Sequence, residues 1–296
     1  MVAESRHHHP WHYRVMAEQP ELLAEFSAEM LPPATLKKLK ETPGLALGEI
    51  AGRDAIAAII QLVEEGKVEA ILPTVAYNGA QCGELESIYY AQEVLSKRLG
   101  KGRLFEPLFL GSPKFWQALT LRFVDELQER FGFFTPYVGC HHYVHAVRVP
   151  LAKKLGCQFI ISGERESHDG AVKLTQTPAV LGAYRDVVAE FGLELLQPLR
   201  DVRRGGAVVE ILKEDWAQGK RQLRCALSGN YKDSDGCVDF GEGRRFSDEK
   251  SRHFLDAYAV PLTRRILAKL CRGEQAGYEA EAAACLAALK GAPTCS

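Results

Sequence analysis

Three absences narrow what this chain of 296 residues can be. Its apolar runs are far shorter than the roughly 20 residues of a membrane-spanning helix, and the polar, histidine-rich residues 1–16 lack the apolar stretch of a secretory signal. Its eight cysteines form no Cys-x-x-Cys pair. A formal charge of −1 gives no overall field to hold nucleic acid. We therefore expect a cytoplasmic protein whose cysteines are thiols, metal ligands or catalytic groups rather than disulfides.

The composition, with 46% hydrophobic and 25% charged residues, is typical of a globular protein with a hydrophobic core. Apolar strands alternate with segments of helical periodicity between residues 45 and 197. Five alternations with short connections predict the α/β class and a doubly wound, parallel, five-stranded sheet. Strands are predicted at 45–50, 70–76, 103–110, 157–162 and 193–197, and helices at 54–65, 84–99, 115–131, 142–155 (with a kink at Pro150) and 178–191.

The two ends of the chain are predicted to be helical extensions of this sheet. Residues 17–42 read as one or two short helices broken at Pro32-Pro33. After residue 198 the pattern is less regular, and glycines, including Gly205-Gly206 and Gly229, indicate loops. Further helices are predicted at 247–272 and 275–289.

The turn after the first predicted strand, Ile50 to Ala55, has the pattern of an anion site. Small residues let a phosphate approach the backbone, and the amides that open a helix point at it. Asp54 is suited to cap that helix. The same pattern also fits an ordinary strand-to-helix turn with an Asp cap.

A second unusual turn follows the fourth predicted strand, at residues 163–169. Glu164, Glu166, His168 and Asp169 crowd behind Gly163. Such a cluster at the ligand edge of a parallel sheet can hold Mg²⁺ beside a triphosphate. The alternative is a solvated charged loop.

Both turns resemble segments of the PP-loop ATP pyrophosphatases. Ile50-Ala51-Gly52-Arg53-Asp54-Ala55 resembles the SGGxDS loop of that superfamily, with Ile50 and Ala55 in place of the two serines. Residues 153–167 (KKLGCQFIISGERES) are similar to a helix–strand–glycine segment of 4-thiouridine synthetases and tRNA thiolases. Gln176-Thr177-Pro178 and Leu195–Asp201 resemble later segments of the synthetases, so the resemblance spans roughly residues 45–215.

The resemblance implies a Rossmann-like sheet of the HUP type and an adenylating enzyme that uses ATP and Mg²⁺ and releases pyrophosphate. It divides the chain into an N-terminal helical extension (1–42), a nucleotide-binding domain (43–215) and a Cys-containing loop with a helical region (216–296). Arg53 is a candidate to replace the missing serine hydroxyls at the phosphates, with Asp54 beside it. The nucleotide contacts that it implies are Ile50, Ala51, Gly52, Arg53, Asp54, Ala55, Thr74, Ala76, Tyr77, Gly163 and Glu164.

Cys140 stands just before a predicted helix, where sulfur-inserting members carry a Cys-x-x-Cys, and Tyr137 occupies the place of the first cysteine. Cys140 is therefore a candidate catalytic sulfur carrier. Together with Cys82, Cys225 and Cys237 it is also a candidate ligand set for a 4Fe–4S cluster or, with histidine, for Zn²⁺. The alternative is that these cysteines are small buried hydrophobic residues.

His142 and His145, three positions apart on one face of the predicted helix, are expected to be hydrogen-bonded at the surface. Basic groups near residues 97–103, 200–204 and 220–224 offer only weak support for a tRNA partner, since most such groups are solvated surface.

The preferred hypothesis is an adenylating enzyme that inserts sulfur into a nucleobase or small molecule. A non-catalytic adenine-nucleotide sensor remains open because both serines are missing. An iron–sulfur or zinc protein of sulfur metabolism also remains open, as does a homodimer.

Overall fold

The central sheet occupies the middle of the molecule in the computed structural model, which describes residues 10–82, 85–100, 102–217, 219–229 and 247–290. Its strands are β1 (Leu45–Glu49), β2 (Ala70–Ala76), β4 (Leu108–Leu110), β5 (Phe159–Ile161) and β6 (Glu194–Leu196). All four pairings in this sheet are parallel, in the order β4-β2-β1-β5-β6. The chain thus builds outward from β1 on one side and then crosses to the other, which confirms the predicted doubly wound, five-stranded α/β fold.

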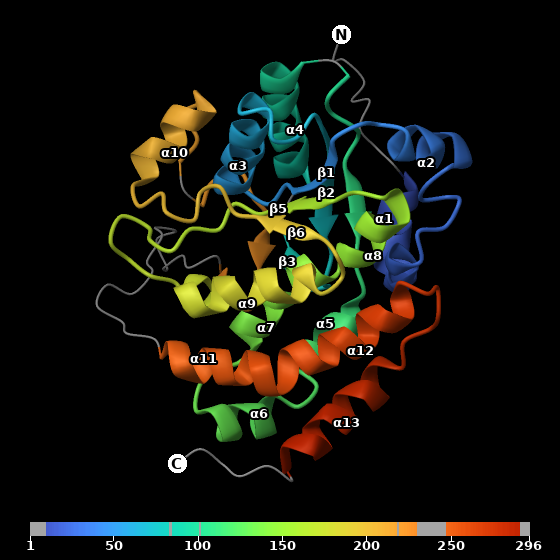
Figure 1. Ribbon diagram of the computed structural model, residues 1–296, viewed down its shortest axis with the longest axis vertical. Helices are drawn as coiled ribbons and strands as arrows, with labels where there is room; N and C mark the ends of the chain where they lie inside the picture. Colours follow the sequence, from blue (N-terminus) through green and yellow to red (C-terminus); the bar gives the residue numbers. More distant parts are fainter. Residues whose placement is uncertain (1–9, 83–84, 101, 218, 230–246, 291–296) are drawn as a thin grey trace.

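Helices cover both faces of the sheet (Figure 1). One face carries α3 (Arg53–Glu64), α4 (Glu86–Leu99) and α10 (Gly205–Leu212). The other carries α5 (Pro113–Leu119), α7 (Pro136–Ala146), α8 (Val149–Leu155) and α9 (Pro178–Ala189). Successive β1 residues point to opposite faces of the sheet. Ala46 therefore packs in the hydrophobic core on the α3 side, and Leu47 packs in the hydrophobic core on the α7 side.

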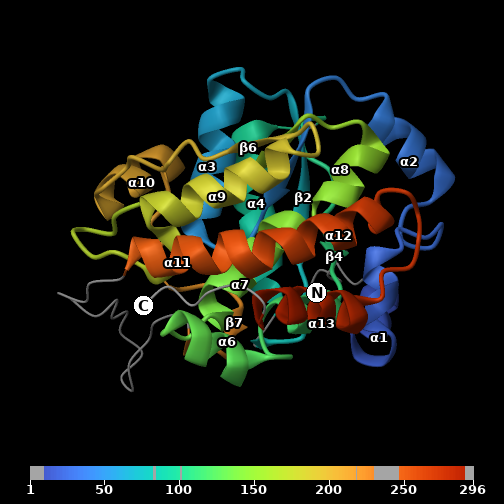
Figure 2. The same ribbon diagram turned by 60° about the horizontal axis from the view of Figure 1, so that its bottom comes forward.

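The C-terminal helices form an outer layer on the second face, and Figure 2 shows α11 running alongside α9. This layer consists of α6 (Val124–Phe131), α11 (Asp248–Phe254), the π-helical turn η4 (Leu255–Ala259), α12 (Val260–Leu270) and α13 (Tyr278–Lys290). Phe254, Leu262 and Ile266 are fully buried in the same core as Leu47. Helices α11, α12 and α13 therefore share a core with the sheet.

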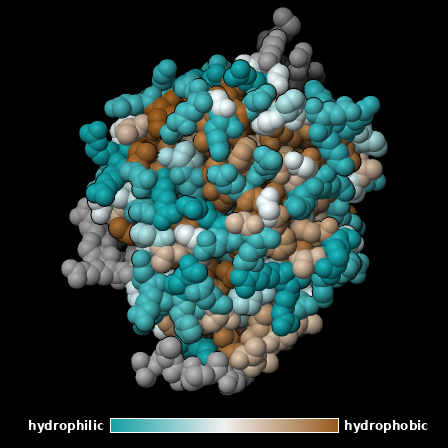
Figure 3. Space-filling model, viewed as in Figure 1, coloured by the Kyte–Doolittle hydropathy of each residue, from teal (hydrophilic) through white to brown (hydrophobic). Residues whose placement is uncertain are grey.

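The remaining elements lie at the sheet's edges. They are α1 (Pro10–Glu18), the 3-10 turns η1 (Pro20–Ala24) and η2 (Leu174–Gln176), α2 (Pro33–Lys40), and the short antiparallel pair β3 (Gln81–Cys82) and β7 (Arg224–Cys225). The break predicted at Pro32-Pro33 is confirmed, because α2 begins at Pro33. No helix in the described part of the chain is long and apolar enough to cross a membrane. Polar side chains cover most of the face in Figure 3.

Two predicted helices are each split in two. The helix predicted at 115–131 is interrupted between α5 and α6, where the Thr120 hydroxyl donates to the Trp116 carbonyl and three amides share the Gln117 carbonyl. The helix predicted at 142–155 begins six residues earlier, at Pro136, and ends at Ala146 before α8 begins. Pro150 lies in the first turn of α8, where its missing N–H costs nothing. Cys140 therefore lies inside α7 rather than before a helix.

Gly205-Gly206 were expected to mark a loop, and this expectation is wrong. Both glycines belong to α10, which begins at Gly205 and packs on α3. A Cβ at Gly205 would come within 2.9 Å of both Arg53 Nη2 and Asp169 Oδ2, so the glycine permits a close approach rather than a loop conformation. Predicted strand 103–110 is likewise shortened to β4, with a single further bridge between Leu104 and Ile71.

Replacing Leu47 with alanine tests the position of the core. Leu47 lies fully buried in the central strand, so Leu47→Ala is expected to lower the free energy of unfolding by about 2–5 kcal/mol through lost burial and a cavity. Leu121→Ala is the matched control, since Leu121 is 38% exposed and its loss should change stability by less than about 0.5 kcal/mol. Urea unfolding of both variants measures the difference, and equal effects would contradict this position for β1.

Candidate functional site

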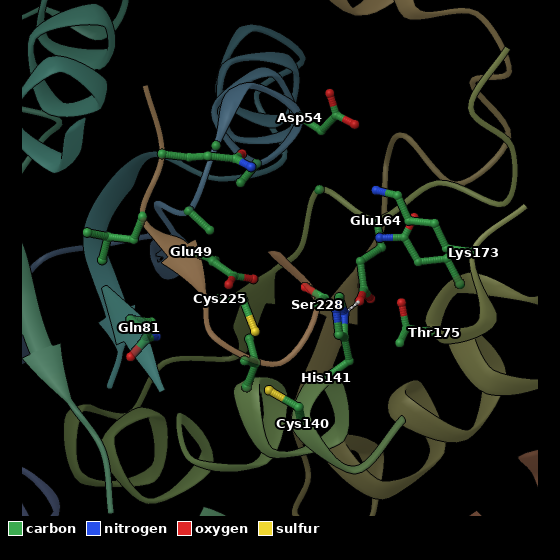
Figure 4. A pocket seen from close by; sticks show the side chains of 18 of the residues that line it. Glu49, Asp54, Gln81, Cys140, His141, Glu164, Lys173, Thr175, Cys225 and Ser228 are labelled. Carbon is green, nitrogen blue, oxygen red and sulfur yellow. Dashed lines mark hydrogen bonds and ion pairs between the residues drawn. The ribbon is translucent and has the colours of Figure 1, made fainter. Parts of the chain in front are cut away.

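A cavity of about 260 Å³ opens at the carboxyl edge of the sheet, where the chain leaves β1 and β5 in different directions. This is the switch point at which doubly wound sheets bind their ligands. Figure 4 shows Asp54 and Lys173 at one end of the cavity and Cys140 at the other. The walls come from the turn after β1, from Gly163 and Glu164 after β5, from α7, from residues 173–176 and from the segment around β7.

The turn after β1 opens α3 against the cavity. Gly52 is the N-cap in an extended conformation, and no side chain caps the helix. The amides of Asp54 and Ala55 have no hydrogen-bond partner among the described residues. Ala51, Gly52, Arg53, Asp54 and Ala55 all line the cavity, whereas Ile50 is 1% exposed and belongs to the core. Unpaired amides at a helix N-terminus are the elements of an anion site.

The expected role of Asp54 as the helix cap is wrong. Its carboxylate instead accepts from Arg165 Nε at 2.9 Å and from Arg53 Nε at 3.1 Å. Burial alone would raise the pKa of Asp54, but the charges of Arg165, Lys173 and Arg53 outweigh burial and lower it. Asp54 is therefore a carboxylate that joins the turn after β1 to the turn after β5.

Arg165 continues this connection into the protein. Its guanidinium is fully buried, and Nη2 donates to His168 Nδ1 at 2.9 Å. Burial, with the nearby charge of Lys173, lowers the pKa of His168 to about 3. His168 is therefore neutral, with Nδ1 accepting from Arg165 and Nε2–H donating to Gln176 Oε1.

Gly163 sets the distance between the two turns. A Cβ at this position would come within 2.3 Å of Ala55 N and 2.4 Å of the Ala55 Cα. No side chain can be placed there without displacing the start of α3. The first residue after β5 thus packs directly on the backbone that carries the unpaired amides.

Lys173 is a site residue that the sequence analysis missed. It lines the cavity from the segment before η2, close to Asp54. Burial lowers its pKa to about 8, although the Asp54 charge opposes the shift. An ammonium group near the unpaired amides adds a cation where an anionic ligand would lie. The resemblance covered this stretch, but no local pattern distinguishes Lys173 from a surface lysine.

The acidic cluster expected after β5 is dispersed by the fold. Only Glu164 of these carboxylates lines the cavity. Glu166 pairs with Arg200 Nε at 2.6 Å, and Asp169 accepts from the amide of Gly205 at 2.9 Å. The cavity gains a different carboxylate, Glu49, from the last residue of β1. Strand ends are where such a group is expected in this fold class.

Glu164 is buried between two histidines of α7. Its carboxylate contacts His141 Nδ1 at 2.8 Å and His145 Nε2 at 2.9 Å. Burial by itself would raise the pKa of Glu164, but His145 and His141 outweigh burial and lower it. The expectation that His142 and His145 are surface groups is wrong, because both are at most 1% exposed and they diverge, His142 reaching Thr263 of α12.

Cys140 and Cys225 line the other end of the cavity, and Figure 4 shows their sulfur atoms pointing toward one another. Cys140 Sγ accepts from Asn78 Nδ2 at 3.5 Å, and burial raises the pKa of the Cys140 thiol to about 12. Cys82 is exposed and lines a neighbouring cavity instead, and Cys237 lies outside the described residues. Within the described ranges, no three His, Cys, Asp or Glu side chains are grouped to hold a metal ion.

Three of the predicted nucleotide contacts, Thr74, Ala76 and Tyr77, which the resemblance assigns to adenine, lie outside this cavity's lining. The Thr74 hydroxyl donates to the Gly48 carbonyl at 3.0 Å, and the Ala76 carbonyl accepts from Gln81 Nε2. The Tyr77 amide donates to the Leu110 carbonyl at 2.7 Å, and the Tyr77 ring lines the neighbouring cavity of about 270 Å³. Adenine contacts at these residues therefore stay a prediction.

No model of a protein family matches the chain, but the chain is similar to an archaeal protein. The uncharacterized protein MJ0009 of Methanocaldococcus jannaschii is 42% identical over 207 residues, which cover 69% of this chain and 73% of the relative. The similarity thus spans most of both chains.

Asp54→Asn tests the connection between the two turns. The substitution leaves the buried Arg165 without its charged partner, so the free energy of unfolding should fall by about 3–5 kcal/mol at neutral pH. In the wild type, the Asp54 contribution is present above its unfolded pKa of about 3.9 and is lost as the pH falls toward the lower folded pKa. The free energy of unfolding of Asp54→Asn should therefore fall less on acidification than that of the wild type.

Denaturant unfolding between neutral pH and about pH 3 measures both effects. Asp186→Asn is the control, because Asp186 forms an exposed pair with Arg252 and should contribute no more than about 1 kcal/mol. Matching curves for the two variants would show that the Asp54–Arg165 pair does not hold the turns together.

Proposed function

This chain belongs to the same family as the archaeal protein MJ0009, and we propose that it is an ATP-binding enzyme of the PP-loop type that adenylates an acceptor and releases pyrophosphate. One observation carries the proposal. The unpaired amides of Asp54 and Ala55 open α3 into a cavity at the switch point of a parallel sheet. Backbone amides in this arrangement bind phosphate without any side-chain hydroxyl.

The charges around these amides favour a polyphosphate. Lys173 and Arg53 line the same end of the cavity, and the resemblance places the triphosphate there. These two cations offset the absence of both serines, because charged donors form stronger hydrogen bonds to phosphate than hydroxyls do. Mg²⁺ would accompany ATP, with Asp54 and Glu49 as the candidate carboxylates of the cavity wall, because both oxygens of Glu164 are bonded to histidines.

In the proposed reaction, a carbonyl oxygen of the acceptor attacks the α-phosphorus of ATP. A new P–O bond forms, the bond to the β-phosphate oxygen breaks, and pyrophosphate leaves. The acceptor then carries AMP on that oxygen. Positioning and electrostatic stabilisation supply the rate, because the developing charge on pyrophosphate faces the helix N-terminus and the cations.

The thiols at the other end of the cavity favour sulfur as the second nucleophile. A persulfide on Cys140, loaded by a persulfide donor, loses its proton and attacks the activated carbon through its terminal sulfur; a C–S bond forms, and AMP leaves with the acceptor oxygen. The Cys225 thiolate then attacks Cys140 Sγ, the S–S bond to the transferred sulfur breaks, and the thiolated product leaves. An external thiol reduces the resulting Cys140–Cys225 disulfide. Cys225 faces Cys140 across the cavity and is the second candidate thiol. The cavity of about 260 Å³ favours a small molecule or a single nucleobase as the acceptor. The six described cysteines are free thiols, in keeping with a proposed cytoplasmic location.

The second candidate function is a nucleotide sensor, favoured by Ile50 and Ala55 at the two serine positions. An adenylating enzyme and a nucleotide sensor would both bind ATP. ATP that stays bound and intact with every acceptor offered, including nucleobases and small amides, would support the sensor and exclude the enzyme.

Gly163→Ala tests the phosphate site itself. The added Cβ would displace the Ala55 backbone. ATP affinity should fall about 10- to 100-fold, since one hydrogen bond to a charged phosphate is worth about 1.5–3 kcal/mol. Titration calorimetry with Mg²⁺·ATP measures the affinity, and circular dichroism verifies that the variant is folded.

Gly182→Ala is the matched glycine control, because a Cβ at Gly182 in α9 meets nothing within 4 Å. This variant should bind ATP like the wild type and be about 0.5–1 kcal/mol more stable. Unchanged ATP binding in a folded Gly163→Ala protein would remove the start of α3 from the phosphate site.

Cys140→Ala separates adenylation from sulfur transfer. The variant should bind ATP normally, because Cys140 lies at the end of the cavity away from Lys173, but should form no thiolated product. Product formation from ATP, an acceptor and a persulfide donor is followed by mass spectrometry. Cys271→Ala, at an exposed cysteine of the outer layer, should retain full activity. Normal product formation in Cys140→Ala would exclude the sulfur-carrier role.

A further inference from the structure

Glu164 and two histidines form a hydrogen-bonded chain that ends in the cavity. His141 and His145 lie one helical turn apart on α7, and each contacts one oxygen of the Glu164 carboxylate. Glu164 is 6% exposed and His145 is 1% exposed, whereas the His141 side chain is 35% exposed. The chain of contacts thus leads from the interior to one accessible imidazole.

The contacts determine which nitrogen of His141 is available. An ionised carboxylate only accepts hydrogen bonds, so His141 Nδ1 carries the hydrogen that it donates to Glu164. In the neutral ring, Nε2 then has a lone pair. No described residue forms a hydrogen bond with this Nε2, and His141 lines the cavity beside Cys140 (Figure 4).

The surrounding packing holds this arrangement in place. The His145 ring packs on Tyr184 with 5.1 Å between ring centroids, and the Ser162 hydroxyl lies 3.3 Å from Glu164 Oε2. The other described histidines near the site are differently bound. His142 contacts Thr263, and His168 is bonded through both nitrogens to Arg165 and Gln176. Among the described histidines, His141 is the one in the cavity wall.

We propose that His141 is the general base of this site and takes the proton of a protic nucleophile, a thiol or an amine, through Nε2. Glu164 is a positioning residue that fixes the hydrogen of the neutral ring on Nδ1 and aims Nε2 into the cavity, and His145 holds the Glu164 carboxylate in place. The assignment rests on the proposed adenylating function. A carboxylate behind an imidazole both orients the ring and stabilises the imidazolium that forms.

The step that His141 assists is the displacement of AMP. The nucleophile loses its proton to Nε2 while its sulfur or nitrogen forms a bond to the adenylated carbon. The bond from that carbon to the AMP oxygen breaks, and AMP leaves with the bonding electrons. The imidazolium then releases its proton to water, which restores the starting state.

Diethyl pyrocarbonate tests the geometry without any nucleotide. This reagent acylates an accessible imidazole nitrogen that carries a lone pair, and peptide mass spectrometry locates the product. His141 should be acylated faster than His142, His145 and His168 in the folded wild-type protein. Glu164→Gln should slow His141 acylation roughly tenfold, as expected from loss of one charge-assisted hydrogen bond. Equal acylation of the four histidines, or no effect of Glu164→Gln, would overturn the inference.

Kinetics test the catalytic role. His141→Gln should lower kcat for AMP displacement by about 10²–10⁴-fold while the affinity for Mg²⁺·ATP and the pyrophosphate-releasing step persist. Added imidazole should partly restore kcat in His141→Ala. His253→Gln, a half-buried histidine that packs on Phe131 of the outer layer, is the matched control. An unchanged kcat in His141→Gln would overturn the inference.

The two proposals fail in different ways. If wild-type protein does not bind ATP, the adenylating function fails, and the role of His141 in AMP displacement fails with it even if acylation confirms the geometry. If ATP binds and pyrophosphate is released but neither acylation nor kcat depends on His141, the general-base assignment alone fails.

Discussion

The ion pair between Asp54 and the fully buried Arg165 is the interaction on which the arrangement of the site depends. It connects the segment that leaves β1 with the segment that leaves β5, at the point where the two diverge. A buried guanidinium without its carboxylate is costly, so neither segment can move independently. Gly163 reinforces the connection, because its missing side chain lets the second segment touch the backbone of Ala55. The unpaired amides at the start of α3 are therefore held beside the turn that carries Gly163 and Glu164.

The cavity beside this ion pair has two chemical environments. Around the start of α3, backbone amides and the cations Arg53 and Lys173 form a region suited to phosphate. About α7, the thiols of Cys140 and Cys225 face one another beside the imidazole of His141. Glu164 bounds both regions, since it follows β5 and binds the histidines of α7. An adenylated intermediate formed at the first region would lie next to the proposed nucleophile, Cys140, and the proposed base, His141, at the second region. Adenylation followed by displacement of AMP requires this arrangement.

Much of the fold could be predicted because local signals and the global fold agree. Strand β2 lies at the predicted residues, α9 begins at its predicted residue, and α3 begins one residue before its predicted start. These elements could be predicted because apolar periodicity and helix-boundary residues both act locally. Prediction failed where long-range packing decided the outcome. Gly205 opens a helix because Arg53 and Asp169 crowd against it, and α10 covers α3. His142 and His145 are buried because outer-layer helices and Glu164 cover α7, and nothing in the local pattern reveals that cover.

By itself, the sequence determined the class of the fold, the edge of the sheet at which a site would lie, and the two turns that border it, because alternating strands and helices allow few arrangements. Only the tertiary structure decided the partners of the charged groups. It assigned Asp54 to Arg165 instead of a helix cap, separated Glu166 and Asp169 from Glu164, and brought Lys173 and Glu49 to the cavity. The physical reason is that charges pair through space: a buried charge is stable only beside its opposite, and residues distant in the chain supply that partner.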